Sequence, residues 1–384
     1  MKILKTIVAL VLALGLGLAM LSSCEPKKPA LTKSGLDPAA FVAEVDGIPI
    51  GLYTLTNANG MEVCVTNFGG RIVSIMAPDR NGELRDVVLG FDNVQNYMTV
   101  PSDFGASIGR FANRIGGAQF ELGDKTVQLL KNDGENCLHG GPKGWQYQPY
   151  SVEQVDPSTI KLTRDSKDGD MNFPGHVIAV TTYKLTDDNA IDITYSATTD
   201  APTVINMTNH SYFNLSADPS RDAMDEILYI NSTAFTPTDK ALIPTGEIAD
   251  IIDTPLDFRT PTAIGKRIDT PDCEPLAFAG GYDHNWILDN NCDVKVLSCK
   301  LVSPVTGIGL EVYTDQPGVQ FYAGNFLDGT APGKGGIKYP RRSGICLETQ
   351  NYPDAPNHPE FPSPVLKPGE TYTHHCIFKF TVEK

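Results

Sequence analysis

Short segments in which every second residue is apolar recur along this chain of 384 residues. Residues 177–185 and 191–195 alternate in this way, and the turn-forming sequence Asp-Asp-Asn lies between them at 187–189. Such a pair is typical of a β-hairpin, and residues 308–312 and 376–380 repeat the alternation. No segment of twelve or more residues has the period of an amphipathic helix. We therefore predict an all-β protein.

Turn-forming residues separate these segments and indicate a single large domain. The chain contains 35 Gly and 28 Pro, many of which fall between the alternating segments. Hydrophobic residues make up 41% of the sequence, which is enough for a large core. No internal repeat and no change of composition is evident after residue 45. Many short strands with turns between them favour a β-sandwich or a barrel, and we expect one domain over residues 46–384.

The N-terminal residues have the pattern of an export signal. Lys2 and Lys5 precede an apolar run over residues 7–21, and Leu-Ser-Ser-Cys lies at 21–24. The run is shorter than the roughly 20 residues that a membrane-spanning helix needs. A cationic start before such a run is typical of a secretory signal peptide. The last four residues resemble the bacterial lipobox, in which cleavage before the cysteine exposes that residue for lipidation.

We therefore predict a signal peptide at residues 1–23 and a lipidated Cys24, with residues 24–45 as a tether that contains several prolines. An ordinary signal peptide or a retained anchor is the alternative. The predicted protein is exported and is held at a membrane by its lipid. An acidic residue follows the cysteine, but Lys27 and Lys28 dilute any acidic sorting signal, which favours the periplasmic side.

Cysteine number and net charge exclude some classes of protein. If Cys24 is acylated, seven of the eight cysteines remain, and an odd number cannot all pair within the chain. Their spacing shows no compact disulfide framework, so we expect most of them to be small buried apolar residues. The formal net charge of −15 argues against nucleic acid as a partner, because phosphate binding needs a basic surface. A neutral ligand remains compatible with this negative charge.

Polar side chains, tight turns and aromatic residues occur together in several segments of the predicted domain. These segments are GRFANRI at 109–115, NCLHGG at 136–141, TNHSYFNL at 208–215, GYDHNW at 281–286, and GVQFY at 318–322 with CLETQ at 346–350. Each segment alone has another explanation: His139 could be a turn residue, and Arg110 and Arg114 could be solvated charges on a strand. Glu348 follows the apolar Ile-Cys-Leu, so it either faces solvent or lies in a lined pocket.

Taken in this order, the segments resemble the aldose 1-epimerase (galactose mutarotase) family. The joint pattern of GRFANRI, LHGG, TNHSYFNL, GYDHNW, PGVQFYAGNF and CLETQ extends the resemblance over residues 46–384, without a departure at a position that the family uses. The resemblance implies a large antiparallel β-sandwich of the galactose mutarotase type, with an open and concave sugar-binding face. It also implies an enzyme that interconverts the α and β anomers of a free aldohexose such as galactose or glucose.

The resemblance further implies a role for each matching residue. Glu348 is similar to the general base that takes the proton of the anomeric hydroxyl, and His210 to the general acid that protonates the ring oxygen. His139 is similar to the second histidine, which assists at the ring oxygen and holds the sugar. The remaining matches imply residues that position the substrate or pair with its hydroxyls: Asn113, Arg114, Asp283 and Gln320.

Mutarotation requires only two positioned proton-transfer groups. One group takes a proton from the anomeric oxygen while another gives one to the ring oxygen, and the aldehyde then rotates and recloses. No electrons move between molecules and no strong nucleophile is needed, so we expect no cofactor and no covalent intermediate. His210 has to be protonated at the start, and a nearby anion would favour that state. Asp283 and Glu348 are the two candidates for this anion.

Aromatic side chains near the motifs have two interpretations. They could stack on the apolar faces of a sugar, as rings in sugar sites do, or they could fill the core of the sandwich. The sequence leaves this choice open for Tyr212, Phe213, Tyr282 and Trp286.

A metal site is not expected. The adjacent His374 and His375 would point to opposite faces of a strand, and His358 lies in a Pro-rich segment without suitably spaced partners. Two other functions remain as alternatives, a lectin that has lost the chemistry and a different sugar enzyme on the same scaffold. A phosphorylated sugar would call for a cluster of Arg and Lys. Glycoside hydrolysis would call for a second catalytic carboxylate, for which only Asp283 is available.

Overall fold

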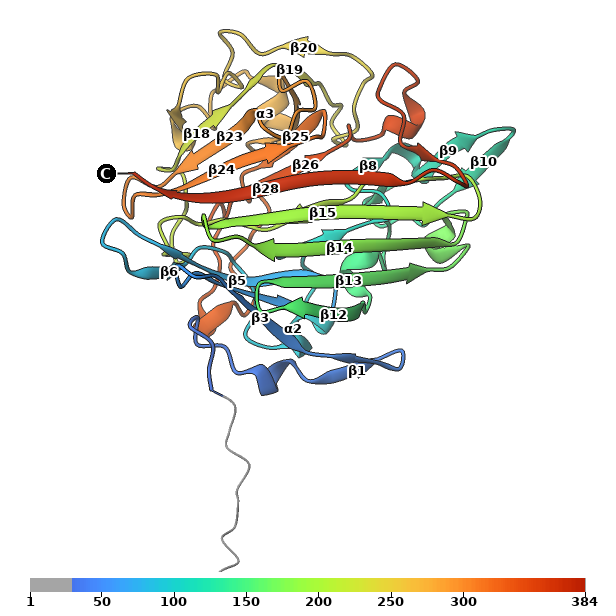
Figure 1. Ribbon diagram of the computed structural model, residues 1–384. Coiled ribbons are helices and arrows are strands. Elements are labelled where there is room, and N and C mark those ends of the chain that lie inside the picture. Colours follow the sequence, from blue (N-terminus) through green and yellow to red (C-terminus); the bar gives the residue numbers. More distant parts are fainter. Residues whose placement is uncertain (1–29, 384) are drawn as a thin grey trace, which may run out of the picture. The chain divides into compact units, whose positions relative to one another are not determined.

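The computed structural model describes residues 30–383, whose regular secondary structure is mostly antiparallel β (Figure 1). Within this range the α-helices are α2 (Val94–Thr99) and α3 (Glu274–Ala279), each six residues long. Neither of these helices, nor any other described one, has the length and apolar character needed to cross a membrane. The prediction of an all-β protein is confirmed.

Three antiparallel sheets of four or more strands form the body of the protein. The largest has, in spatial order, β12 (Ser151–Asp156), β13 (Thr159–Ser166), β14 (Val177–Leu185), β15 (Ala190–Thr199), β28 (Tyr372–Val382), β24 (Ile308–Thr314), β23 (Leu297–Val302), β18 (Ile227–Ile230) and β21 (Thr262–Ala263). The second has β20 (Ala249–Asp250), β19 (Ser232–Thr236), β22 (Asp283–Leu288), β25 (Gly318–Tyr322) and β26 (Cys346–Gln350). The third has β3 (Leu52–Thr56), β4 (Glu62–Thr66), β5 (Arg71–Pro78) and β6 (Leu84–Asp86).

The predicted hairpin lies within the nine-stranded sheet. β14 and β15 pair from Val177 with Thr199 to Leu185 with Ile191. Every second residue of β14 is buried, because one face of this sheet packs on the core while the other meets solvent. The other two alternating segments lie in β24 and β28, which pair with each other in the same sheet. The alternation was thus a correct guide to these strands.

One hydrophobic core joins the three sheets. It contains Tyr183 and Ile193 from the nine-stranded sheet, Trp286 and Phe321 from the five-stranded sheet, and Ile75 from the four-stranded sheet. Full burial of an apolar side chain such as that of Phe321 contributes about 1.5–3 kcal/mol. The sheets pack face to face through these residues, so the prediction of an antiparallel β-sandwich is confirmed.

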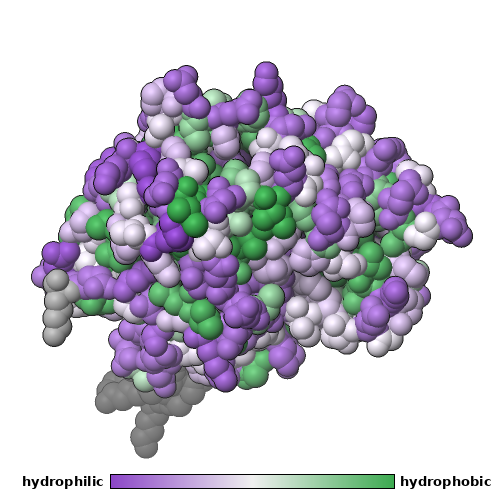
Figure 2. Space-filling view, turned by 90° about the horizontal axis from the view of Figure 1, so that it is seen from above, coloured by the Kyte–Doolittle hydropathy of each residue, from purple (hydrophilic) through white to green (hydrophobic). Residues whose placement is uncertain are grey.

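The face of the protein shown in Figure 2 is mostly hydrophilic. On the face that Figure 2 shows, hydrophobic residues form separate small patches among hydrophilic ones. A globular protein leaves such scattered apolar residues exposed without functional consequence.

The folded body begins earlier in the chain than predicted. Residues from Leu31 onward belong to one compact unit, in which the side chains of Leu36 and Phe41 are buried. β1 (Ala43–Val45) then pairs with β2 (Ile48–Ile50). The prediction that residues 24–45 form a tether is therefore wrong from residue 31 onward, because two apolar side chains of this segment are buried in a second hydrophobic cluster of the folded body. The predicted signal peptide at residues 1–23 and the predicted lipidation site Cys24 lie outside the described residues.

The cysteines of the described residues behave as predicted. All seven are free, and most of them are buried, as expected for small apolar residues. The buried ones are Cys64, Cys137, Cys299, Cys346 and Cys376. Burial raises the pKa of the Cys137 thiol to about 12, which keeps this side chain protonated and unreactive.

Candidate active site

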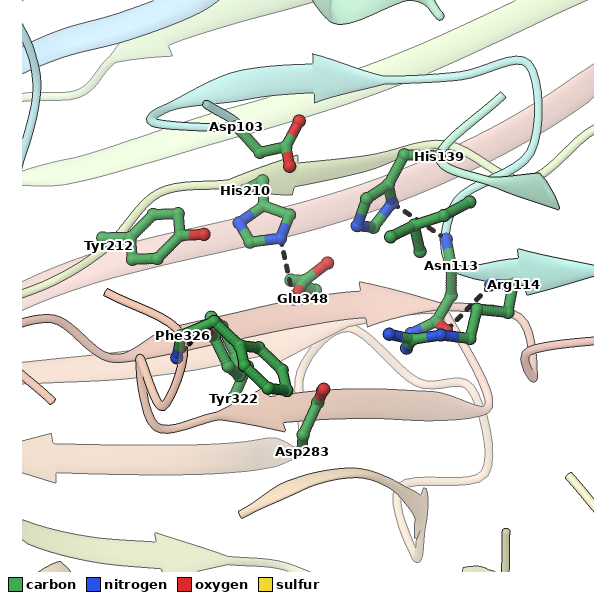
Figure 3. Close-up of a pocket in the computed structure, with 11 residues that line it drawn as sticks. Asp103, Asn113, Arg114, His139, His210, Tyr212, Asp283, Tyr322, Phe326 and Glu348 are labelled. Atoms are coloured by element: carbon green, nitrogen blue, oxygen red, sulfur yellow. Dashed lines mark hydrogen bonds and ion pairs between the residues drawn. The ribbon is translucent and has the colours of Figure 1, made fainter. Parts of the chain in front are cut away.

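A cavity of about 180 Å³ brings together residues that are far apart in the sequence (Figure 3). Six of the seven predicted catalytic and sugar-binding residues line it, and Gln320 does not. The residues that line the cavity are Asp103, Asn113, Arg114, Leu138, His139, His210, Tyr212, Asp283, Tyr322, Phe326 and Glu348. The sequence motifs therefore meet at a single site in the fold.

Glu348 lies in β26, all of whose residues are buried. Its side chain is 2% exposed and Oε1 lies 3.5 Å from Nε2 of His210. The second oxygen, Oε2, is buried and has no hydrogen-bond partner among the described residues. Of the two interpretations open from the sequence, the lined pocket is the correct one. Burial, followed by the charge of Asp283 and then that of Asp103, raises the pKa of Glu348 well above its usual range.

His210 ends the short strand β17 (Thr208–His210), which pairs with β7 (Ala106–Ile108). The backbone NH of Gly105 donates to the carbonyl of His210 at 3.0 Å, which holds the peptide in place. The imidazole stacks on the ring of Tyr212, with 5.0 Å between ring centroids. Burial lowers the pKa of His210, while the nearby charges of Asp103 and Asp283 raise it.

Glu348 and His210 form a buried pair whose titrations are linked by the short distance between them. Burial disfavours the charged form of each group, which raises the pKa of Glu348 and lowers that of His210. With one proton on the pair, that proton lies either on His210, as an ion pair, or on Glu348, with both groups neutral. The two arrangements have the same net charge and differ only in the position of one proton.

His139 presents a neutral imidazole to the cavity. Its Nδ1 accepts a hydrogen bond from the backbone NH of Asn113 at 3.1 Å, so the neutral ring carries its hydrogen on Nε2. Burial lowers the pKa of His139 to about 3. The turn that holds this ring needs a glycine at residue 140, where φ is +80° and a Cβ would meet the carbonyl oxygen of Gly109 at 2.2 Å. His139 is therefore a fixed hydrogen-bond donor.

Arg114 supplies the positive charge among the residues that line the cavity. It begins β8 (Arg114–Ile115), which pairs with β11 (Cys137–Leu138) and so lies beside His139. Its Nε donates to Oδ2 of Asp133 at 2.7 Å. The side chain is nearly buried, so the interpretation as a solvated strand charge is wrong. It is wrong for Arg110 as well, whose buried guanidinium donates to the carbonyls of Pro174 and Gly175 outside the cavity.

Asp283 and Gln320 face each other on paired strands. Nε2 of Gln320 donates to Oδ1 of Asp283 at 2.7 Å, and Asp283 lines the cavity in front of it. In the five-stranded sheet Gln320 is also the register partner of Glu348. The geometry therefore puts Gln320 behind the carboxylates, where it orients Asp283.

The aromatic residues near the motifs divide between the two interpretations. Tyr212 lines the cavity, whereas Phe213, Tyr282 and Trp286 are fully buried in the hydrophobic core. Tyr322 and Phe326 also line the cavity, and their rings stack with 5.9 Å between centroids. Phe326 is 62% exposed, which leaves its face open to a ligand.

Asp103 and Phe326 were missed by the sequence reasoning. Asp103 lies outside the quoted motifs, in the sequence Pro-Ser-Asp-Phe-Gly, and nothing in its local pattern distinguishes it from a turn residue. Phe326 is the last residue of the matched PGVQFYAGNF segment, so the motif itself could have identified it. Asp133, the partner of Arg114, had no signal at all.

Two groups of side chains have metal-ligating types at suitable distances. They are Asp103 with His139 and His210, and His210 with Cys346 and Glu348, with ligand atoms within 4.8 Å of one another. The donors fit a metal poorly. Nε2 of His139 carries the hydrogen of the neutral ring, and burial raises the pKa of Cys346 well above its usual range, so that thiol stays protonated.

The remaining histidines have other partners. His374 is buried and its Nδ1 lies 3.0 Å from the carbonyl oxygen of Met207, whereas His375 lies 2.8 Å from a carboxylate oxygen of Asp192. The two rings therefore have separate surroundings, as predicted for neighbours on a strand. His358 has a carboxylate oxygen of Asp354 and one of Glu360 at 3.2 Å from its ring, but these residues are not among the groups of the described residues whose geometry could hold a metal.

Known protein sequences show which family this chain resembles. Residues 51–379 match the protein family described as aldose 1-epimerase. Galactose mutarotase from Bos taurus is 41% identical over 339 residues, which cover 87% of this chain and 96% of the relative. Aldose 1-epimerase from Escherichia coli (strain K12) is 38% identical over 340 residues, which cover 88% of this chain and 97% of the relative.

Solved structures agree with these sequence relatives. An aldose epimerase homologue from C. elegans superimposes with a TM-score of 0.81 at 29% identity, covering 87% of this chain and 100% of the other. Galactose 1-epimerase from Lactobacillus acidophilus NCFM gives a TM-score of 0.78 at 27% identity, covering 89% of this chain and 97% of the other. The length of the matches, their identity and the shared fold together show that the chain belongs to the aldose 1-epimerase family of isomerases.

Proposed function

We propose that this enzyme opens and recloses the ring of a free aldohexose, galactose or glucose, with Glu348 as general base and His210 as general acid. The observation that carries this proposal is the 3.5 Å distance between Glu348 Oε1 and His210 Nε2 in the wall of one cavity. The anomeric hydroxyl and the ring oxygen are bonded to the same carbon of the sugar. Two proton-transfer groups that lie side by side can therefore each reach one of these oxygens.

The reaction moves two protons and no other atoms between enzyme and sugar. Glu348 takes the hydrogen of the anomeric hydroxyl while His210 gives a proton to the ring oxygen, and the bond between the anomeric carbon and the ring oxygen breaks. The resulting aldehyde rotates about its bond to the next carbon. Return of the protons, with acid and base exchanged, closes the ring on the opposite face.

The proton distribution of the pair matches these steps. A closed sugar needs the proton on His210 and a free carboxylate on Glu348, whereas the open aldehyde leaves the proton on Glu348 and a neutral His210. These are the two one-proton arrangements of the buried pair described above. During ring opening, His210 gives a proton to the sugar and Glu348 takes one from it, so the pair changes from one arrangement to the other. The net charge of the buried pair does not change.

The other residues of the cavity supply donors and acceptors for sugar hydroxyls. The fixed hydrogen on Nε2 of His139 and the guanidinium of Arg114 can donate, and Asp283, oriented by Gln320, can accept. The exposed ring of Phe326 offers a surface for the apolar face of the sugar. This combination of polar groups with an aromatic surface is typical of a site for a neutral sugar.

A phosphorylated sugar fits the same cavity poorly. Arg114 is the sole cationic side chain of Lys or Arg type among the residues that line it, against three carboxylates: Asp103, Asp283 and Glu348. Phosphate recognition normally uses several basic groups. The charges of the lining therefore favour an unphosphorylated aldose over a hexose phosphate.

Polarimetry on freshly dissolved α-galactose and α-glucose tests the activity, and chelation tests its chemistry. The enzyme should speed the approach to the anomeric equilibrium, and dialysis against excess EDTA should change the rate less than about twofold, because proton transfer by side chains needs no ion. The spontaneous rate in the same buffer is the control. A rate that falls on chelation and returns with a divalent cation would contradict the proposed mechanism.

We further propose that the enzyme is exported and anchored by a lipid on Cys24, facing the periplasm. The support is the cationic start, the apolar run and the Leu-Ser-Ser-Cys sequence before the predicted cleavage site. Such a location would present the enzyme with sugars before their uptake.

Expression of the full chain in a bacterial host with radiolabelled palmitate tests this anchor. The wild-type protein should carry the label and sediment with membranes, whereas Cys24→Ala should lose the label. Cys292→Ala, which changes an exposed cysteine of the folded body, is the matched control and should keep it. Equal labelling of wild-type and Cys24→Ala would contradict the proposed lipidation site.

A further inference from the structure

Asp103 lies at the edge of the cavity in the loop before β7, and its backbone is held on both sides. The guanidinium of the fully buried Arg71 donates to the carbonyls of the residues before and after it, at 3.0 and 2.9 Å. The next residue but one, Gly105, donates its NH to the carbonyl of His210 at 3.0 Å. These contacts fix the loop against the strand that carries His210, so the position of Asp103 is set by the fold.

The carboxylate of Asp103 faces the two histidines of the cavity. One of its oxygens lies within 4.8 Å of a ring nitrogen of His139 and of a ring nitrogen of His210. Figure 3 shows it beside the gap between the two imidazoles, on the side away from Asp283. Its Oδ1 is buried and has no hydrogen-bond partner among the described residues. A buried carboxylate oxygen without a partner is costly, and such a group is retained where it has an electrostatic task.

Charged and titratable groups face His210 from every neighbouring element. They are Asp103 from the loop before β7, Glu348 and Cys346 from β26, Asp283 and Tyr322 from β22 and β25, Arg71 from β5, His139 from the turn after β11, and Tyr212 from its own segment. Burial lowers the pKa of His210, and among the charges that raise it Asp103 comes before Asp283. For Glu348 the order of these two carboxylates is reversed.

We infer that Asp103 is a positioning residue for the shared proton, and that its carboxylate holds this proton on His210 while Glu348 remains free to act as base. This inference rests on the acid and base roles proposed above. Asp103, whose carboxylate oxygen lies within 4.8 Å of a ring nitrogen of His210, then favours the arrangement that the closed sugar needs. His139 cannot take the proton instead, because its Nδ1 is occupied by the NH of Asn113 and its Nε2 already carries a hydrogen.

Asp103→Asn tests the inference, because it removes the charge and keeps the shape. Both limbs of the pH profile of kcat/KM should move to lower pH by about one unit, since an opposite charge at this distance raises the pKa of a histidine by about 1–3 units. Turnover at the optimum should fall about tenfold, because more of the one-proton pair has its proton on Glu348. KM should change little. Asp103→Glu restores the charge and should recover part of both effects.

A direct measurement separates this inference from the proposed function. In protein labelled with ¹⁵N in its histidine rings, the signals of His210 should show less imidazolium at neutral pH in Asp103→Asn than in the wild type. Asp328→Asn is the matched control, because Asp328 is an exposed acid that does not line the cavity. It should leave the His210 signals and the pH profile unchanged. Thermal unfolding of each variant shows whether the fold is intact.

Two results would overturn the inference. The first is an unchanged pH profile with unchanged His210 signals in Asp103→Asn. The second is a large rise of KM alone, which would make Asp103 a partner for a sugar hydroxyl. Neither result affects the acid and base roles of His210 and Glu348, which are tested by substitutions of those two residues.

Discussion

Glu348→Gln should lose most of the mutarotase activity while sugar binding and stability remain close to those of the wild type. Glutamine has the shape of glutamate but cannot accept the proton of the anomeric hydroxyl. A general base typically contributes about 10²–10⁴-fold to the rate, and the loss should fall in that range. Burial already favours an uncharged group at this position, so the neutral amide should be tolerated.

Polarimetry gives the rate of the Glu348→Gln variant, and calorimetric titration with galactose gives its sugar affinity. Glu226→Gln is the matched control, since Glu226 is also fully buried, has a pKa that burial raises to about 8, and lies outside the cavity. This control should keep the wild-type rate. If Glu348→Gln were as fast as the parent, the assignment of the base would be wrong.

His210→Asn should give the second large loss, again by about 10²–10⁴-fold. Asparagine keeps a short polar side chain at the end of β17 but cannot donate a proton to the ring oxygen at neutral pH. The pH profile should also change in form. Because the proposed mechanism needs a protonated His210, wild-type activity should fall as pH rises through the higher pKa of the pair. That descending limb should be absent from the His210→Asn profile.

His375→Asn is the control for this substitution. His375 lies on β28 and interacts with Asp192 on the nine-stranded sheet, outside the cavity. Its replacement should leave both the rate and the pH profile of mutarotation unchanged. A His210→Asn variant that retains the wild-type descending limb would show that another group is the acid.

Burial of Glu348 and His210 has consequences for the proposed proton transfer. Glu348 and His210 are both buried, and the low dielectric constant of these surroundings strengthens the interaction between them. Burial also limits the competition of water for the transferred protons. The same burial would make a net change of charge expensive. In the proposed mechanism one proton leaves His210 and one reaches Glu348, which avoids that cost because the charge of the site is the same before and after ring opening.

The strands and the chemical groups of the site could be predicted from the sequence because they depend on local patterns. β14 and β15 follow from alternation, which reports which face of a strand is buried. Glu348, His210, His139 and Asp283 lie in motifs that together resemble those of the aldose 1-epimerase family, and all of them line one cavity.

Two features depend on packing between distant segments, and no local pattern reports them. Leu36 and Phe41 look like parts of a Pro-containing linker until the core to which they bind is known. Gln320 alternates like its neighbours, yet it lies behind Asp283 and not in the cavity wall. Contacts between side chains from distant segments decide both cases.

The identity of the anion beside His210 also could not be predicted from local sequence patterns. The sequence reasoning considered Asp283 and Glu348, because both lie in motifs, and the structure adds Asp103 from a loop that no motif covers. Residue types and strand periods follow from the order of residues along the chain, since each depends on near neighbours. The sharing of a proton depends on a few ångströms between groups that lie on different sheets and in a loop, and only the packed fold sets those distances.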